Sequence, residues 1–193
     1  MPLSHIEPKI IYKDDFIFVL DKRPKCHSVM HEENTQDSLA YWLKSAYPGQ
    51  TDIGKTFHDC GLVQRLDYET SGLILAARDQ DSWEKLFANL KAGLIKKYYY
   101  CLLKGKLDPK HIEIEGFIGS PYRGASKMNH YATQPAKSDR ALAAKTSFDL
   151  VKYLAEEDLS LVKATADSAR RHQIRVHAKA IKHPLAGKKR NDA

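Results

Sequence analysis

The sequence lacks the cysteine pattern of a disulfide framework or of a zinc site. Its three cysteines, Cys26, Cys60 and Cys101, are odd in number and lie far apart in a chain of 193 residues. Disulfide-rich proteins usually carry an even number of cysteines, and zinc sites space them closely. This usage is typical of a reducing compartment, so we expect a cytoplasmic protein that binds no metal ion.

The sequence also has no charged-then-apolar leader, and no apolar run in it is long enough to cross a bilayer. It contains no internal repeats and no long low-complexity tract. The length fits one domain, or one domain with a small appendage. We therefore expect a soluble chain that makes no membrane contact.

Positive charge is in excess. The chain has 31 Lys and Arg against 24 Asp and Glu, a formal net charge of +7, and 42% hydrophobic residues. The hydrophobic content is sufficient for a core, and the basic excess favours a polyanionic partner such as nucleic acid. Many basic proteins bind nothing of this kind, so charge alone does not identify the partner.

Hydrophobic periodicity predicts strands with interspersed helices. Short apolar or alternating runs predict strands over 10–12, 16–20, 73–77, 96–104, 141–154 and 159–165. Helical spacing and capping residues predict a helix that begins after Thr35 or Asp37, a second between Asp79 or Asp81 and Gly93, and a third over 170–182. Segment 105–134 is rich in turn-forming and basic residues and predicts a mobile loop. This order predicts an α+β fold with a mixed, mainly antiparallel sheet flanked by helices.

One stretch, Gln64–Arg78, combines a charged, hydroxyl-rich loop with a short apolar run that suits a strand buried on both faces. Asp67 lies in the loop, two residues from Arg65. For an isolated Arg-x-Asp, the simplest interpretation is an aspartate that caps its own turn, helped by Thr70 and Ser71. A metal-dependent nuclease would need more converging carboxylates than this stretch supplies.

The cluster Cys26, His27 and His31 invites interpretation as a metal site, but its spacing matches no metal-binding pattern, so solvated loop histidines are the simpler interpretation. The aromatic residues on the two predicted N-terminal helices are most simply core residues.

Three separated stretches, in this order, resemble the motifs of the RluA-type RNA pseudouridine synthase family. Gln64–Arg78 resembles the first motif, and Lys97–Gly105 resembles the Lys-x-Tyr-x-Ala-Leu-Val-x-Gly motif, with Cys101 in the usual Ala position. Residues 170–177 followed by 183–187 are similar to the third. The resemblance covers residues 10–187 as one pseudouridine synthase-like catalytic domain and leaves 188–193 as a polar tail. Three ordered motifs of this length are a far stronger signal than any short pattern.

The resemblance implies the site residues. Asp67 would be the catalytic residue, and Arg65, Tyr99, Ile174 and Arg175 would bind the substrate, with Arg175 paired to Asp67. Tyr99 would stack on the uracil of a flipped-out uridine, and Arg65 would fill the vacated space. The carboxylate would attack the sugar, attack the uracil ring or abstract a sugar proton, and the residues do not choose among these. No redox change or external group is involved, so no cofactor is expected.

The chain departs from the family pattern in places. Ala169 replaces the usual Gly before Arg-x-His-Gln, and Arg171 replaces the usual Thr or Ser. Family members normally continue past His-Pro-x-x-Gly into further strands, and no S4-type RNA-binding module precedes Ile10 here. The leading hypothesis is a monomeric enzyme that isomerises a uridine in ribosomal or transfer RNA. The alternative is a catalytically impaired RNA-binding remnant of the same fold.

Overall fold

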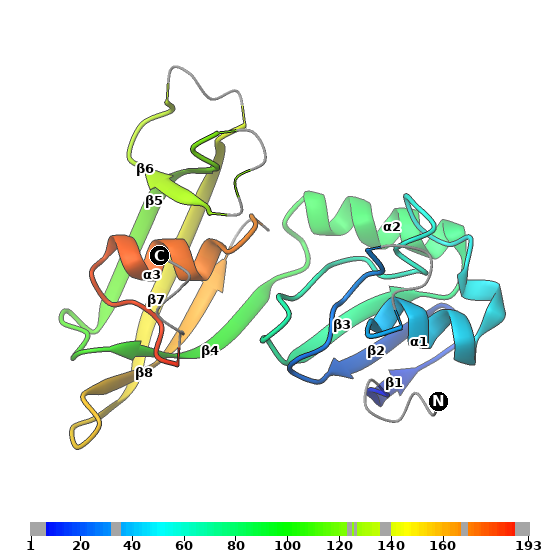
Figure 1. The fold of residues 1–193 in the computed structure, drawn as a ribbon, viewed down its shortest axis with the longest axis horizontal. Coiled ribbons are helices and arrows are strands. Elements are labelled where there is room, and N and C mark those ends of the chain that lie inside the picture. Colours follow the sequence, from blue (N-terminus) through cyan, green and yellow to red (C-terminus); the bar gives the residue numbers. More distant parts are fainter. Residues whose placement is uncertain are drawn as a thin grey trace. The chain divides into compact units, whose positions relative to one another are not determined.

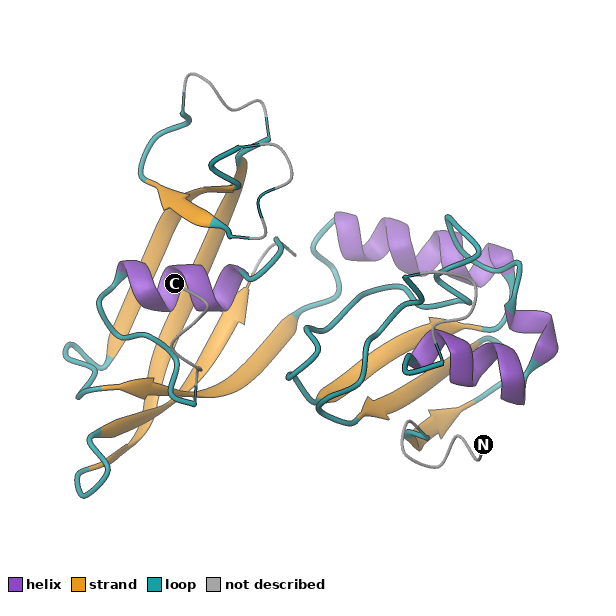
Figure 2. Ribbon diagram, in the orientation of Figure 1, coloured by secondary structure: helices purple, strands orange, loops and turns teal. Residues whose placement is uncertain are grey.

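The computed structural model describes residues 7–31, 36–122, 125, 127–135, 140–166 and 170–187. The chain divides into two compact units, Met1–Ala92 and Gly93–Ala193. Each unit holds its own sheet, and all pairs of named strands are antiparallel (Figure 1). With three α-helices among the described elements, the fold is α+β, as the sequence predicts (Figure 2).

The first unit contains a three-stranded sheet in the order β1-β2-β3. Its strands are β1 (Lys9–Lys13), β2 (Ile17–Lys22) and β3 (Gly72–Ala77). The two strands predicted over 10–12 and 16–20 are confirmed, and they pair as an antiparallel hairpin. Its turn is fixed by Asp14, whose Oδ1 accepts the backbone N–H groups of Phe16 at 2.8 Å and Ile17 at 2.7 Å.

Two helices complete the first unit. α1 (Leu39–Ala46) leads into a 3-10 turn, η2 (Pro48–Gln50), and α2 (Gln80–Lys91) follows β3. The predicted cap of α1 at Asp37 is wrong, because the hydroxyl of Ser38 accepts the N–H of Tyr41 instead; Thr35, the other candidate, lies outside the described residues. The cap of α2 at Asp79 is confirmed, since its carboxylate accepts the N–H of Ser82.

β3 contributes to two hydrophobic clusters. Ile74 and Ala76 pack in the cluster that includes α1, whereas Leu75 and Ala77 pack with Trp83 of α2. The expected burial on both faces is therefore found along most of the strand. It fails at the first apolar residue, Leu73, which is 56% exposed because neither cluster reaches it.

The second unit contains a five-stranded sheet in the order β4-β8-β7-β5-β6. Its strands are β4 (Lys97–Lys104), β5 (His111–Gly119), β6 (Asn129–Tyr131), β7 (Leu142–Leu154) and β8 (Leu159–Ala166). One face packs against α3 (Gln173–Ala180), with Phe148, Val162 and Ala178 in the shared core. The two strands predicted over 141–154 and 159–165 are confirmed as β7 and β8, and they pair as an antiparallel hairpin.

The expectation of a mobile basic loop over 105–134 is wrong, because this segment contributes β5 and β6. Ile112 and Ile114 alternate with polar residues, which is the strand period, and both pack against the core of the unit. The glycines that suggested turns serve close packing instead. Gly116 has a φ of +153°, and a Cβ there would clash with the ring of His130 and the carbonyl of Tyr131 in β6.

The third helix is shorter than the predicted 170–182, because it begins at Gln173 and ends at Ala180. Beyond it the chain returns to the edge of β4, where the N–H of Lys104 donates to the carbonyl of Pro184 at 2.9 Å. The N–H of Ala186 donates to the carbonyl of Leu102 at 2.8 Å. Residues 188–193, the predicted tail, lie outside the described part of the chain.

Candidate active site

Asp67 lies in a loop whose two ends are both tied to β3. Before the loop, the N–H of Val63 donates to the carbonyl of Leu75 at 3.0 Å, and the indole N–H of Trp83 donates to the carbonyl of Leu62 at 3.1 Å. After it, the chain enters β3 directly at Gly72. Both ends of the loop are therefore fixed to the core of the first unit, and these contacts set the position of Asp67.

Asp67 is the first residue of a tight backbone turn. The N–H of Thr70 donates to the carbonyl of Asp67 at 3.0 Å, which closes a turn over residues 67–70. Aspartate is favoured at the first position of such turns. The turn-capping interpretation of this Asp therefore fits the backbone, and it is compatible with a chemical role because Asp67 itself is only partly buried.

Arg65, the second candidate in this loop, is paired with a carboxylate that no motif in the sequence identifies. Its Nη2 lies 3.0 Å from Oδ1 of Asp59, whose side chain is 10% exposed, whereas that of Arg65 is 63% exposed. The other oxygen of Asp59 accepts the N–H and the hydroxyl of Thr56, each at 3.1 Å. The guanidinium is thus held by an anchored acid near the protein surface.

Tyr99 lies in β4 of the second unit. Tyr99 faces the α3 side of the sheet, while Tyr98 and Tyr100 are 55% and 70% exposed on the other face, as strand alternation requires. Tyr99 is partly buried and packs against the core cluster beside Cys101. Burial raises the pKa of the Cys101 thiol to about 11, so this cysteine is neutral and can fill the family's usual Ala position as a small apolar residue.

Ile174 and Arg175 lie in the first turn of α3. Ile174 packs partly buried against the core cluster, and Arg175 is partly buried next to it. The helix is fixed to β7 by Gln173 and His177, which lie outside the predicted site. Gln173 donates from Nε2 to the carbonyl of Lys145 at 2.8 Å and to the hydroxyl of Thr146 at 3.0 Å.

His177, one turn further along α3, is the second such anchor. Its Nδ1 lies 2.8 Å from the hydroxyl of Thr146, and the side chain is completely buried. Desolvation lowers the pKa of His177 to about 4, with a smaller contribution from His130, so the imidazole is neutral near pH 7. Only its spacing from Gln173, four residues along a helix face, could have indicated that both point toward the sheet.

The predicted site residues are divided between the two units. Arg65 and Asp67 belong to Met1–Ala92, whereas Tyr99, Ile174 and Arg175 belong to Gly93–Ala193. The pairing of Arg175 with Asp67 and the substrate contacts of all five residues stay predictions.

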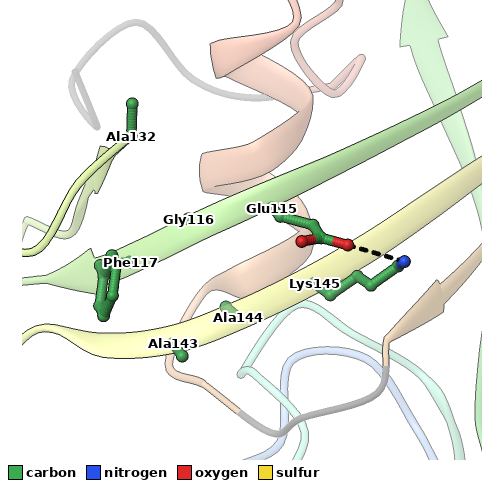
Figure 3. Close-up of a pocket in the computed structure, with 7 residues that line it drawn as sticks. All are labelled: Glu115, Gly116, Phe117, Ala132, Ala143, Ala144 and Lys145. Carbon is green, nitrogen blue, oxygen red and sulfur yellow. Dashed lines mark ion pairs between the residues drawn. The ribbon is translucent and has the colours of Figure 1, made fainter.

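A surface hollow in the second unit contains none of these candidates. It is lined by Glu115, Gly116, Phe117, Ala132, Ala143, Ala144 and Lys145, from β5, β7 and the chain after β6 (Figure 3). Glu115 and Lys145 form an ion pair at 2.7 Å across it. Since its charged groups already neutralise each other, the hollow offers little for a charged ligand.

The histidines beside Cys26 interact with each other and with an acid. Nε2 of His31 lies 2.9 Å from Nδ1 of His27, and His27 lies 3.9 Å from a carboxylate oxygen of Asp37. The described ranges contain no group of three or more His, Cys, Asp or Glu side chains placed to hold a metal ion. No helix within the same ranges is long and apolar enough to span a membrane.

The architecture is that of an RNA pseudouridylate synthase domain. The chain is similar to the solved human structure "RNA Pseudouridylate Synthase Domain Containing 1", with a TM-score of 0.74 over 97% of this chain and 71% of the human one. The two are 22% identical, so this likeness establishes the fold.

The family model described as RNA pseudouridylate synthase matches residues 17–180, and the chain belongs to that family of isomerases. It is 29% identical to the uncharacterized RNA pseudouridine synthase YjbO of Bacillus subtilis, covering 92% of this chain and 58% of the relative. It is 28% identical to the ribosomal large subunit pseudouridine synthase D of Nitrosomonas europaea, covering 93% of this chain and 48% of the relative. The chain thus spans about half the length of the curated relatives it matches.

Proposed function

We propose that this chain is the catalytic domain, residues 10–187, of an enzyme that converts a specific uridine in ribosomal or transfer RNA into pseudouridine. The observation that carries the proposal is the Asp67 loop, which is tied to β3 at both ends and lies within the matched residues 17–180. A carboxylate on a fixed loop suits a reaction in which one acid must meet one reacting centre with defined geometry.

The reaction detaches uracil from the ribose at N1, turns it and rejoins it at C5. It changes no oxidation state and transfers no external group, so the residues alone can supply the chemistry. Asp67 acts as the nucleophile or the base, and the target uridine is flipped out of its stack to reach it. In this proposal Tyr99 stacks on the uracil, and Arg65 fills the space that the flipped base leaves in the RNA. Ile174 and Arg175 make further contacts with the substrate.

Ribosomal RNA is the first substrate class to test, because the Nitrosomonas relative is named for the large ribosomal subunit. Transfer RNA is the second. The sequence predictions of a monomer and of a cytoplasmic location belong to the same proposal and rest on the sequence alone.

The test maps pseudouridine in total RNA from cells that carry or lack the gene, and then repeats the reaction with purified protein. Asp67→Asn preserves size and hydrogen bonding but removes the charge, and we expect it to abolish pseudouridine formation while the protein stays folded. Glu157→Gln, which changes an exposed acid in the turn between β7 and β8, is the control and should retain turnover. Turnover by folded Asp67→Asn would refute the assignment, and RNA binding without turnover by the wild type would identify the remnant.

A further inference from the structure

The residue before Asp67 is held by a single buried hydroxyl. Ser28 Oγ donates to the carbonyl of Leu66 at 2.8 Å and accepts the N–H of the same residue at 2.9 Å. The serine is 4% exposed, so these are bonds made away from water. Both backbone polar groups of Leu66 are therefore satisfied by one side chain.

The residue after Asp67 is held from the same segment of the chain. Lys22, at the end of β2, is 1% exposed and donates from Nζ to the carbonyls of Cys26 at 2.8 Å, Arg23 at 2.9 Å and Tyr68 at 3.4 Å. The carbonyl of Tyr68 also accepts the backbone N–H of Cys26 at 3.3 Å. Two donors thus converge on the carbonyl of Tyr68, the residue after Asp67.

A buried lysine is costly unless its ammonium is hydrogen-bonded and its charge is balanced. Burial lowers the pKa of Lys22, and the negative charges of Asp67 and Glu69 act in the opposite direction. The ammonium is thus stabilised where it lies by three carbonyls and by the acids of the loop. A lysine that served only to fill space in a core would be replaced at lower cost by an apolar residue.

We propose that Ser28 and Lys22 are positioning residues that fix the backbone on both sides of Asp67 and so aim its carboxylate. The inference rests on the proposed function, since the position of the Asp67 carboxylate affects the rate only if Asp67 reacts with the uridine. With Leu66 and Tyr68 anchored and the 67–70 turn closed, the backbone of Asp67 has little freedom left. Misplacement of a reacting group by about 1 Å can cost about 100-fold in rate.

The second unit supplies a matched control for Ser28. Ser160 is completely buried, its Oγ donates to the carbonyl of Gly105 at 2.8 Å, and it accepts the N–H of Leu107 at 2.9 Å. Its hydroxyl therefore makes the same kind of double contact, on a loop that carries no candidate site residue. Ser28→Ala and Ser160→Ala remove equivalent bonds and should lower the melting temperature by similar amounts.

The experiment measures single-turnover rates and RNA affinity for both variants, well below their melting temperatures. We expect Ser28→Ala to lose at least about tenfold in rate with RNA affinity unchanged, and Ser160→Ala to stay within about twofold of wild type. Lys22→Met should show the same loss of rate without loss of affinity. A wild-type rate in Ser28→Ala, or an equal loss in Ser160→Ala, would reduce Ser28 to an ordinary structural residue and overturn the inference.

If Ser28→Ala does not fold, Ser28→Cys replaces it, because a thiol has nearly the same shape and forms weaker hydrogen bonds. Its rate must then fall below wild type for the inference to stand. Amide hydrogen exchange separates the two proposals. If the wild type modifies no RNA, the proposed function fails, while faster exchange at Leu66 and Thr70 in the Ser28 variant still supports the anchoring and unchanged exchange refutes it.

Discussion

Arg65 and Asp59 form an ion pair in which the acid is buried and the base is exposed, with Nη2 and Oδ1 3.0 Å apart. The carboxylate is fixed independently by Thr56 through two further contacts. Asp59 therefore does not depend on Arg65 for its place, whereas the guanidinium depends on Asp59 for its direction. An exposed arginine held in this way is well prepared to meet RNA without being essential to the fold.

Arg65→Ala should for this reason lower the free energy of unfolding by less than about 1 kcal/mol, because most of the side chain is exposed to solvent. RNA affinity and turnover should fall much more. The measurement combines denaturant unfolding with RNA binding. Asp59→Ala should lower the free energy of unfolding more than Arg65→Ala does, because it also removes the hydrogen bonds that Thr56 donates to Asp59. Unchanged RNA affinity in Arg65→Ala would remove this residue from the substrate site.

Tyr99 can be tested against its own neighbour. Tyr99→Phe keeps an aromatic face and should retain more RNA affinity than Tyr99→Ala, since stacking contributes about 1–3 kcal/mol per base. Tyr98→Ala is the control, because Tyr98 lies next in sequence on the opposite face of β4. Equal affinities of Tyr99→Phe and Tyr99→Ala would assign Tyr99 to the core alone.

His177 should make the second unit sensitive to acid. Its pKa is lowered from 6.5 to about 4 in the folded protein, so below pH 6.5 the unfolded chain takes up a proton that the folded chain does not. The free energy of unfolding should therefore be at its full value above pH 6.5 and should fall by about 3 kcal/mol as the pH drops toward 4.

Unfolding free energies of wild type and His177→Asn, measured from pH 7.5 to 4, test this expectation. The variant should be less stable at pH 7.5, because it loses the contact with Thr146, but its stability should depend less on pH. His183→Asn, which changes a histidine that is only partly buried, is the control. Parallel pH profiles for wild type and His177→Asn would show that His177 does not cause the acid sensitivity.

Gly116 should be intolerant of any side chain. Gly116→Ala must adopt a φ of +153° and place a methyl group against the ring of His130 and the carbonyl of Tyr131, so we expect a loss of more than about 1 kcal/mol. Gly49→Ala is the control, since Gly49 has open space around it. Hydrogen exchange at Asn129–Tyr131 should accelerate in Gly116→Ala alone, and unchanged exchange there would contradict the packing of β6 on β5.

Local patterns were sufficient where the structure is decided locally. The apolar spacing of Trp83 and its neighbours and the Asp79 cap predict α2, and the alternation in 97–104 predicts that Tyr99 lies on the opposite face of β4 from Tyr98 and Tyr100. The sequence does not predict β5, although Ile112 and Ile114 carry the strand period, because Gly116 and Gly119 are typical of turns. Their purpose is close packing against β6 and Ala141, which only the tertiary fold reveals.

The candidate site shows the same division. The motifs located Asp67, but they gave no indication of the side chains that hold its loop. Lys22 and Ser28 are ordinary polar residues in sequence, and their burial depends on two segments about 40 residues apart that meet in the fold. The sequence does not single out Asp59 for the same reason, since a buried polar group is recognised by its partners and not by its neighbours in the chain.

The register of β2 on β3 has a consequence for how this chain can change in length. Lys22 lies opposite Gly72, and burial along β2 falls on every second residue, Phe18, Leu20 and Lys22. One residue inserted or deleted between Phe18 and Lys22 would turn the ammonium to the opposite face of the sheet, away from Tyr68. The turn at Asp14 precedes β2, so a longer turn there leaves the alternation along β2 and the position of Lys22 unchanged. Insertions are therefore tolerable in the turn before β2 but not within the strand, where the parity of residues sets the geometry of a loop 45 positions downstream of Lys22.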